Sequence, residues 1–289
     1  MKQPVRLLSG VLLALLFSLE TSASERWVVL GGDIAETLSA LKADINLVAR
    51  DDTVLYPETL TALPSVGYLR QLSAESVLSV QPDRILANQH AGPKEVLEQL
   101  DAVGVTLDVV SAPATLAAIA EKVRAVGSYT DRHEQANALA QTLTDKLEYL
   151  ADLPPLPSTR AMFILQHSGL TPRAAGRQTA AHTALKAVGL ENAFAAMEGY
   201  HSVGAEALVR EVPELIIMSA HGLDAMGGPT ALWQLPGMAL TPAGQAQRLI
   251  VIDDQALLGF GPRAPDQLLA LRQDAEALLN ASPTALAAP

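Results

Sequence analysis

The side chains with the clearest potential for chemistry in this chain are Tyr68 and Arg70, which stand two residues apart in the segment GYLRQLSAE. A tyrosine oxygen is one of the few side-chain groups that ligate ferric iron. A phenol, whose ordinary pKa is about 10, ligates well only when a metal or a nearby cation stabilises the phenolate. In an extended segment these two side chains share one side of the backbone, so we expect Arg70 to supply that cation. The alternative is a loop aromatic that packs at the rim of a cleft and holds no metal.

Two further arginines stand at positions that favour an anion. Arg177 lies in a glycine-containing turn just before a predicted helix start at Thr179, and Arg263 lies just before a predicted helix start at Pro265. The N-terminus of a helix attracts negative charge, and a guanidinium binds a carboxylate through two parallel hydrogen bonds. Both arginines are therefore candidates for holding carboxylate groups of a ligand. The alternative for each is a solvated arginine on the surface.

An internal repeat of half-chain length organises the sequence. Residues 72–87, LSAESVLSVQPDRILA, align without a gap with residues 203–218, VGAEALVREVPELIIM. The alignment places Glu75 on Glu206, and a Gly-Tyr pair precedes each copy. A repeat of this size predicts two similar lobes, and a cleft between lobes is a favoured place for a ligand.

The second lobe offers two candidates for a further ligand. His167 follows the predicted strand 162–166, where a side chain at the carboxyl end would face a cleft, although a hydrogen-bonded polar residue at a strand end is an equal alternative. Tyr200 competes for the same role because the repeat places it where Tyr68 stands in the first lobe. The six histidines lack the spacing of a zinc site. The others are weaker candidates, His201 and His221, or are expected on the surface or in loops, His90, His133 and His182.

Short apolar strands alternate with amphipathic helices, which is the rhythm of an α/β protein. We expect two similar lobes, each a mostly parallel sheet with flanking helices, joined by one long backbone helix. The longest helical pattern runs over about 131–150, long enough to bridge two lobes, and a proline-rich segment ends it. The predicted divisions are a signal peptide at 1–23, an N-terminal lobe at 24–128, a connecting helix and linker at 129–157, and a C-terminal lobe at 158–289.

The N-terminus predicts export. A short basic stretch, an apolar run at 7–17 and small residues at 21–23 are typical of a signal peptide cleaved after Ala23; the alternative is an uncleaved anchor. The chain has no cysteine, and so neither a disulfide nor the cysteine of a lipoprotein. Its net charge of -11 argues against nucleic acid or an anionic membrane surface as a partner. We expect a soluble, monomeric protein of the periplasm.

Three segments carry a resemblance to a known family: VGYLRQLSAE at 66–75, AAGRQTAA at 174–181 and FGPR at 260–263. With the two-lobed pattern, they resemble the heme (hemin) uptake binding proteins, within the helical-backbone class (class III, cluster A) of periplasmic binding proteins that feed ABC importers. The class-level similarity covers nearly all of the chain after the signal peptide, whereas the heme-specific part rests on these segments. The resemblance implies that heme b is the transported ligand, with Tyr68 as its axial ligand beside Arg70, and with a second-lobe histidine, His167, as a further ligand.

The resemblance also implies a membrane partner. In this class a glutamate on each lobe docks on an arginine of one subunit of an ABC permease dimer in the inner membrane, and Glu75 and Glu206 match those positions. A glutamate in the first turn of a helix also favours the helix dipole, which is the alternative explanation.

Enzyme motifs are absent from the sequence: it has no GxSxG, HExxH or GxxxxGK[ST]. We therefore expect a binding protein rather than an enzyme. The alternative ligands are a cobalamin or a ferric siderophore bound by the same fold. A remote alternative is an exported hydrolase that uses Asp33, His167 or the pair Asp253-Asp254.

Overall fold

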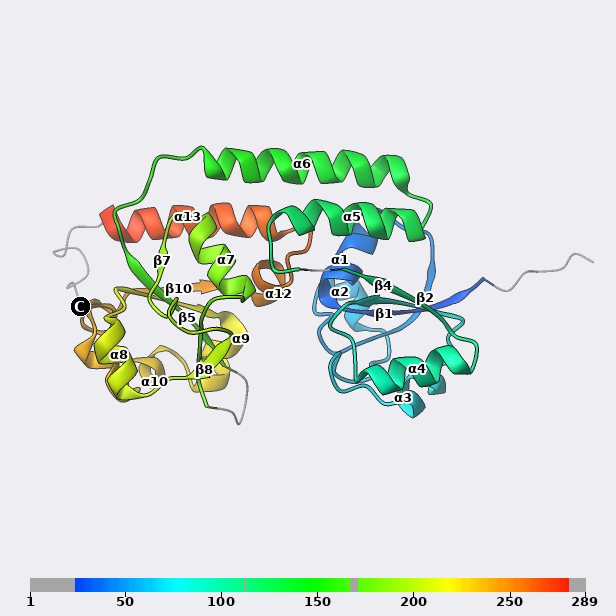
Figure 1. The fold of residues 1–289 in the computed structure, drawn as a ribbon, viewed down its shortest axis with the longest axis horizontal. Helices are drawn as coiled ribbons and strands as arrows, with labels where there is room; N and C mark the ends of the chain where they lie inside the picture. Colours follow the sequence, from blue (N-terminus) through cyan, green and yellow to red (C-terminus); the bar gives the residue numbers. More distant parts are fainter. Residues whose placement is uncertain (1–23, 112, 167–170, 281–289) are drawn as a thin grey trace, which may run out of the picture.

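The computed structural model describes residues 24–111, 113–166 and 171–280, and it contains two α/β lobes side by side beneath a long helix (Figure 1). The predicted signal peptide and His167 lie outside the described residues.

The N-terminal lobe is built on a four-stranded parallel sheet with the order β2-β1-β3-β4. Its central strand, RWVVL, is buried on both faces, as expected of a parallel sheet covered by helices. Trp27 and Val29 pack toward α1 and α5, and Val28 and Leu30 pack toward α3 and α4. The elements are β1 Arg26–Leu30, α1 Gly32–Ala40, β2 Asn46–Arg50, α2 Glu58–Thr61, α3 Ala74–Ser79, β3 Arg84–Asn88, α4 Lys94–Ala102, β4 Thr106–Val110 and α5 Ala117–Tyr129.

The C-terminal lobe has a mixed sheet with the order β10-β9-β5-β6-β8, and β7 pairs with β5. Strands β5, β9 and β10 are parallel, whereas β6 runs antiparallel to both β5 and β8. The expected alternation of strand and helix held for the parallel part and missed the antiparallel strands β6 and β8. The elements are β5 Arg160–Leu165, β6 Arg173–Ala175, α7 Ala180–Ala187, β7 Glu191–Asn192, β8 Tyr200–Ser202, α8 Ala205–Glu211, β9 Leu215–Ser219, α9 Ala220–Met226, α10 Pro229–Trp233, the 3-10 turn Met238–Leu240, α11 Pro242–Ala246, β10 Leu249–Ile252, α12 Asp254–Leu258 and α13 Ala264–Asn280.

Helix α6, His133–Ala151, is the predicted connecting helix, and it lies above both lobes (Figure 1). Its 19 residues span about 29 Å, and it begins two residues later than predicted because Asp131 takes a left-handed backbone conformation. Ala140 and Leu143 pack into the core of the N-terminal lobe, and Leu150 packs into that of the C-terminal lobe. One helix therefore contributes to both cores, and α5 and α13 lie along it.

A buried ion pair joins the lobes below this helix. Lys122 of α5, only 1% exposed, pairs with Asp33 of α1, which is 4% exposed. The ammonium also donates hydrogen bonds to the carbonyls of Gly259 (2.8 Å) and Phe260 (3.2 Å), in the segment between α12 and α13. Asn88, at the end of β3, donates to the same Asp33 oxygen at 2.7 Å. The pair thus ties the N-terminal sheet to the C-terminal segment.

The side chain of Gln255, from α12, makes a second connection. Its amide oxygen accepts hydrogen bonds from the backbone N–H groups of Leu55 and Tyr56, at 2.7 and 3.0 Å. Its amide nitrogen donates to the carbonyl of Gly32 and to the carboxylate of Glu36, both at 3.2 Å. These contacts hold the loop after β2 against the C-terminal part of the chain.

We expect Lys122→Ala to lower the free energy of unfolding by about 3–5 kcal/mol, because it leaves the Asp33 carboxylate buried without its countercharge. Urea denaturation measures this loss. Lys146→Ala is the matched control: Lys146 of the connecting helix α6 pairs with Asp266 of α13 at 2.6 Å, but the two side chains are 36% and 55% exposed. That change should cost only about 0.2–1 kcal/mol. Equal losses for the two variants would show that burial of the pair has no special weight.

Candidate functional site

Tyr68 lies on a loop that buried apolar side chains anchor to the N-terminal lobe. Val66, Leu69 and Leu72 are buried in the core beneath α3 and α4, while Tyr68 itself is 44% exposed. Gly67 has a φ of 104°, a conformation that favours glycine, and it turns the chain just before the tyrosine. The phenol is therefore presented to solvent on a loop whose backbone is held in place.

The segment after Tyr68 is a turn and not an extended strand. The carbonyl of Tyr68 accepts a hydrogen bond from the backbone N–H of Gln71 at 2.8 Å, and Arg70 lies inside this turn. The spacing argument that put both side chains on one side of an extended segment is therefore wrong. The pairing of Tyr68 with Arg70 stays a prediction.

A second loop holds the Arg70 turn from the side. The backbone N–H of Gly92 donates to the carbonyl of Leu69, and the N–H of Leu72 donates to the carbonyl of Gly92, both at 2.9 Å. This second loop carries His90, which follows the carboxyl end of β3. Burial lowers the pKa of His90, and the positive charge of Arg70 lowers it further. Arg70 and His90 are thus neighbours on the surface of the N-terminal lobe.

Arg70 also acts across the lobes, on Tyr200 of β8. Burial raises the pKa of Tyr200 to about 12, and the charges of Arg70 and Arg173 oppose this shift by stabilising the phenolate. Arg70 belongs to the N-terminal lobe and Tyr200 to the C-terminal lobe, so the Tyr68 loop and the antiparallel strand pair β6–β8 face one another.

The antiparallel strand pair β6–β8 sets the position of Arg173. Ala175 pairs with Tyr200 and Arg173 pairs with Ser202 in the antiparallel ladder, and the guanidinium of Arg173 donates a hydrogen bond to the carbonyl of Tyr200. The Tyr200 ring is half-buried and packs against the core of the C-terminal lobe. Tyr200 therefore differs from Tyr68 in its surroundings, although each precedes one copy of the repeat as part of a Gly-Tyr pair.

Arg177 and Arg263 stand before helices α7 and α13, as predicted, and each has a carboxylate partner. Arg177 lies 3.3 Å from the Glu198 carboxylate. Arg263 lies 3.1 Å from Glu36, which is 2% exposed, and 2.6 Å from Asp253. Burial raises the pKa of Glu36, and its bonds to Arg263 oppose the shift. A ligand carboxylate at either arginine would compete with these partners.

The other histidines are dispersed. His201 and His221 are exposed, and His182 lies 3.2 Å from the side-chain amide of Asn192. Sequence reasoning missed His90 and Arg173. His90 follows the carboxyl end of a parallel strand, the same signal that singled out His167. Within 24–111, 113–166 and 171–280, no group of three or more histidine, aspartate or glutamate side chains is placed to hold a metal ion.

Glu75 and Glu206 are exposed in the first turns of α3 and α8. The two helices lie in different lobes, on the side of the molecule opposite to α6 (Figure 1). The predicted matching positions are thus found on one side of the molecule.

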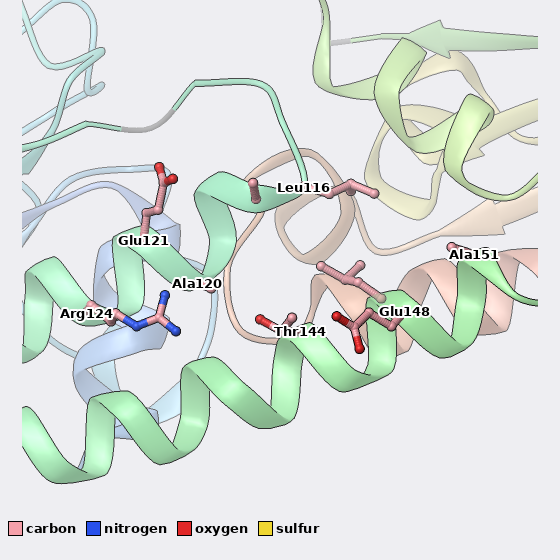
Figure 2. A pocket seen from close by; sticks show the side chains of 9 residues that line it. Leu116, Ala120, Glu121, Arg124, Thr144, Glu148 and Ala151 are labelled. Atoms are coloured by element: carbon pink, nitrogen blue, oxygen red, sulfur yellow. The ribbon is translucent and has the colours of Figure 1, made fainter.

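A groove of about 410 Å³ lies between α5 and α6, on the other side of the molecule from α3 and α8 (Figure 2). Leu116 and Leu147 give it an apolar base, and Glu121, Arg124 and Glu148 stand around it. None of the site residues predicted from the sequence lines it. It belongs to the helical layer that joins the lobes.

The chain matches a family model described as periplasmic binding protein over residues 28–256. That match covers well over half of the sequence, so the chain belongs to this family of periplasmic binding proteins. None of the helices in the described part of the chain has the length and apolar character needed to cross a membrane.

The chain is similar to two solved structures of heme-binding proteins and to one vitamin B12-binding protein. The periplasmic heme-binding protein RhuT from Roseiflexus sp. RS-1, in apo form, has a TM-score of 0.85 and 32% identity, and the match covers 89% of this chain and 100% of that one. A periplasmic heme-binding protein from Pseudomonas aeruginosa has a TM-score of 0.79 and 33% identity, with 88% and 94% covered. The vitamin B12-binding protein of Yersinia pestis (strain Pestoides F) is 27% identical over 75% of this chain and 77% of its own length.

The Tyr200 phenol should stay protonated at a pH where ordinary tyrosines ionise, because its pKa is about 12. Tyr200→Phe should therefore leave the near-ultraviolet phenolate absorbance almost unchanged at about pH 11, where a phenol of pKa about 10 would be mostly ionised. The folded pKa lies above the unfolded value, so the stability linked to the neutral form is fully present below about pH 10 and is lost as the pH rises through about 12. A drop in absorbance equal to one ionised tyrosine would contradict the assignment.

Proposed function

We propose that this protein is the substrate-binding component of an ABC importer, which captures heme between its lobes in the periplasm and delivers it to a membrane permease. The observation that carries the proposal is the Tyr68 loop: an exposed phenol on an anchored turn that also carries Arg70, in a chain similar to heme-binding proteins over nearly its whole length. The signal peptide at 1–23 would direct the export. No step of this function requires catalysis by the protein.

We assign the axial ligand of ferric heme to Tyr68 and not to Tyr200. A phenolate is needed to hold Fe(III), and the high pKa of Tyr200 opposes its ionisation. Tyr68 is exposed, so a bound heme can reach its oxygen without displacing core side chains. His167 remains the proposed second ligand.

The transported ligand is proposed to be heme b, and the nearest rival is a cobalamin. The rival has a specific basis in the similarity to a vitamin B12-binding protein. The edge of a corrin carries neutral amides, whereas heme carries two carboxylates that arginines can bind. Arginines facing one another from the two lobes therefore favour heme. A ferric siderophore is the third candidate.

The function is tested by titrating the purified protein with ferric heme and, separately, with a cobalamin. We expect a saturable shift of the heme Soret band and no binding of the cobalamin. Binding of the cobalamin with no response to heme would replace the proposed ligand and leave the class of protein unchanged.

Tyr68→Phe should weaken heme binding strongly and remove the phenolate-to-iron charge-transfer band, because the ring remains and only the ligating oxygen is lost. Tyr149→Phe is the control, since Tyr149 is 61% exposed on α6, away from the facing loops. Absorption spectra and affinity are compared for the three proteins. If Tyr68→Phe keeps the wild-type spectrum and affinity, another residue ligates the iron.

We further propose that Glu75 and Glu206 dock on the two subunits of a permease dimer. Charge contacts of this kind set register and partner choice more than affinity. The protein is proposed to act as a monomer, one copy spanning both permease subunits.

The double change Glu75→Ala and Glu206→Ala should leave heme affinity and thermal stability nearly unchanged while heme uptake by the native transport system fails. Glu134→Ala is the matched control, because Glu134 is also exposed in a first helical turn but lies on α6, on the opposite side. It should lose the same small helix-dipole contribution, about 0.3–1 kcal/mol, and keep transport. Normal uptake by the double variant would refute docking through these residues.

A further inference from the structure

Arg70 and Arg173 lie on opposite lobes, and neither has a carboxylate partner among the residues that the structure describes. Arg177 and Arg263 are paired with acidic side chains. Among the residues that the structure describes, Arg70 forms no hydrogen bond or ion pair, and the guanidinium of Arg173 donates a hydrogen bond to the backbone carbonyl of Tyr200. Both side chains are exposed, so a ligand can reach their guanidinium groups.

The two charges converge on one place. Each acts electrostatically on the Tyr200 phenol, Arg70 from the N-terminal lobe and Arg173 from the neighbouring strand. Both backbones are well held: the Arg70 turn by hydrogen bonds to Gly92, and Arg173 by the ladder between β6 and β8. His90 lies beside Arg70 on the same surface.

We propose that Arg70 and Arg173 form the carboxylate-binding pair of this site, one from each lobe, and that the Tyr200 hydroxyl donates a hydrogen bond to the same ligand group. The inference rests on the proposed function and deepens it, because it assigns the heme propionates to residues that neither the sequence pattern nor the family match singles out as a pair. Arg173 and Tyr200 are binding residues in this account, and Tyr68 remains the iron ligand.

Physical chemistry favours a carboxylate at this position. Two uncompensated cations close together, in a chain with a net charge of -11, create a local positive potential that attracts an anion. A planar guanidinium matches a carboxylate through two parallel hydrogen bonds. A phenol that stays neutral can donate a hydrogen bond to a carboxylate, whereas a phenolate would repel it, and the pKa of Tyr200 of about 12 keeps it neutral.

A dicarboxylate such as heme would also join the lobes. The two propionates belong to the same edge of one porphyrin. Binding one at Arg70 and the other at Arg173 therefore links the Tyr68 loop to the strand pair β6–β8. Arg177 and Arg263 are less suited to this role, because a ligand would first have to displace Glu198 from one, or Glu36 and Asp253 from the other.

The test is a titration of wild type, Arg173→Gln, Arg173→Lys and Arg177→Gln with ferric heme and with heme dimethyl ester, which lacks the carboxylates. Loss of a charged hydrogen-bonding partner should weaken heme binding by about tenfold to a hundredfold in Arg173→Gln. Arg173→Lys keeps the charge but loses the fork, so it should fall between that variant and wild type. Arg177→Gln should stay close to wild type, and the ester should bind all four proteins with similar affinity.

The outcomes separate this inference from the proposed function. Wild-type heme binding together with wild-type affinity in Arg173→Gln would overturn the inference alone. Equal losses for heme and for the ester would assign Arg173 a structural role in the strand pair β6–β8 and would also overturn the inference. Thermal melting of the variant shows whether the fold is intact. Failure of wild type to bind heme at all would overturn both.

Discussion

The buried charge of Lys122 is the constraint on which the arrangement of the two lobes depends. An ammonium that is 1% exposed must be paired and hydrogen-bonded, because an uncompensated buried charge is very costly. Its partners come from two segments far apart in the chain: Asp33 of α1, whose carboxylate is held also by Asn88 at the end of β3, and the carbonyls of 259–260. Satisfying one side chain therefore fixes the N-terminal sheet relative to the segment that leads into α13.

The helical layer above this pair extends the same constraint. Helix α6 contributes side chains to both hydrophobic cores, so neither core can pack fully unless the other lobe is in place. Because α6 holds the two lobes together, two surfaces below it face one another: the Tyr68 loop of the N-terminal lobe and the strand pair β6–β8 of the C-terminal lobe. The proposed site combines an exposed phenol with the exposed guanidinium groups of Arg70 and Arg173 in a chain of net charge -11, which suits a ferric, dicarboxylate ligand.

The large-scale plan was predictable from the sequence, and the close contacts were not. The repeat predicted two lobes, and the long helical pattern predicted α6, because both signals extend over many residues. Strands β6 and β8 have three residues each, too few to show an alternation of apolar and polar residues. The sequence therefore gave no sign of the strand pair that carries Arg173. The partners of Arg263 illustrate a second limit: Glu36 lies 227 residues away in the chain, and only the folded structure brings them together.

The repeat also misled in one respect. A Gly-Tyr pair precedes each copy, which made Tyr68 and Tyr200 equivalent candidates, yet one lies in an exposed loop and the other in a half-buried strand. Similar sequence in two lobes specifies similar helices and strands, whereas the loops before them depend on each lobe's own contacts. The same environment that raises the pKa of Tyr200 separates the roles of the two tyrosines.

The most direct test of this account is the position of the iron in crystals of the heme complex, located by its anomalous scattering. The account predicts a single strong peak between the lobes, at ligand distance from the Tyr68 oxygen, with the propionate edge of the porphyrin directed toward Arg70 and Arg173. An iron peak elsewhere, such as in the groove between α5 and α6 or on the exposed His201, would contradict it.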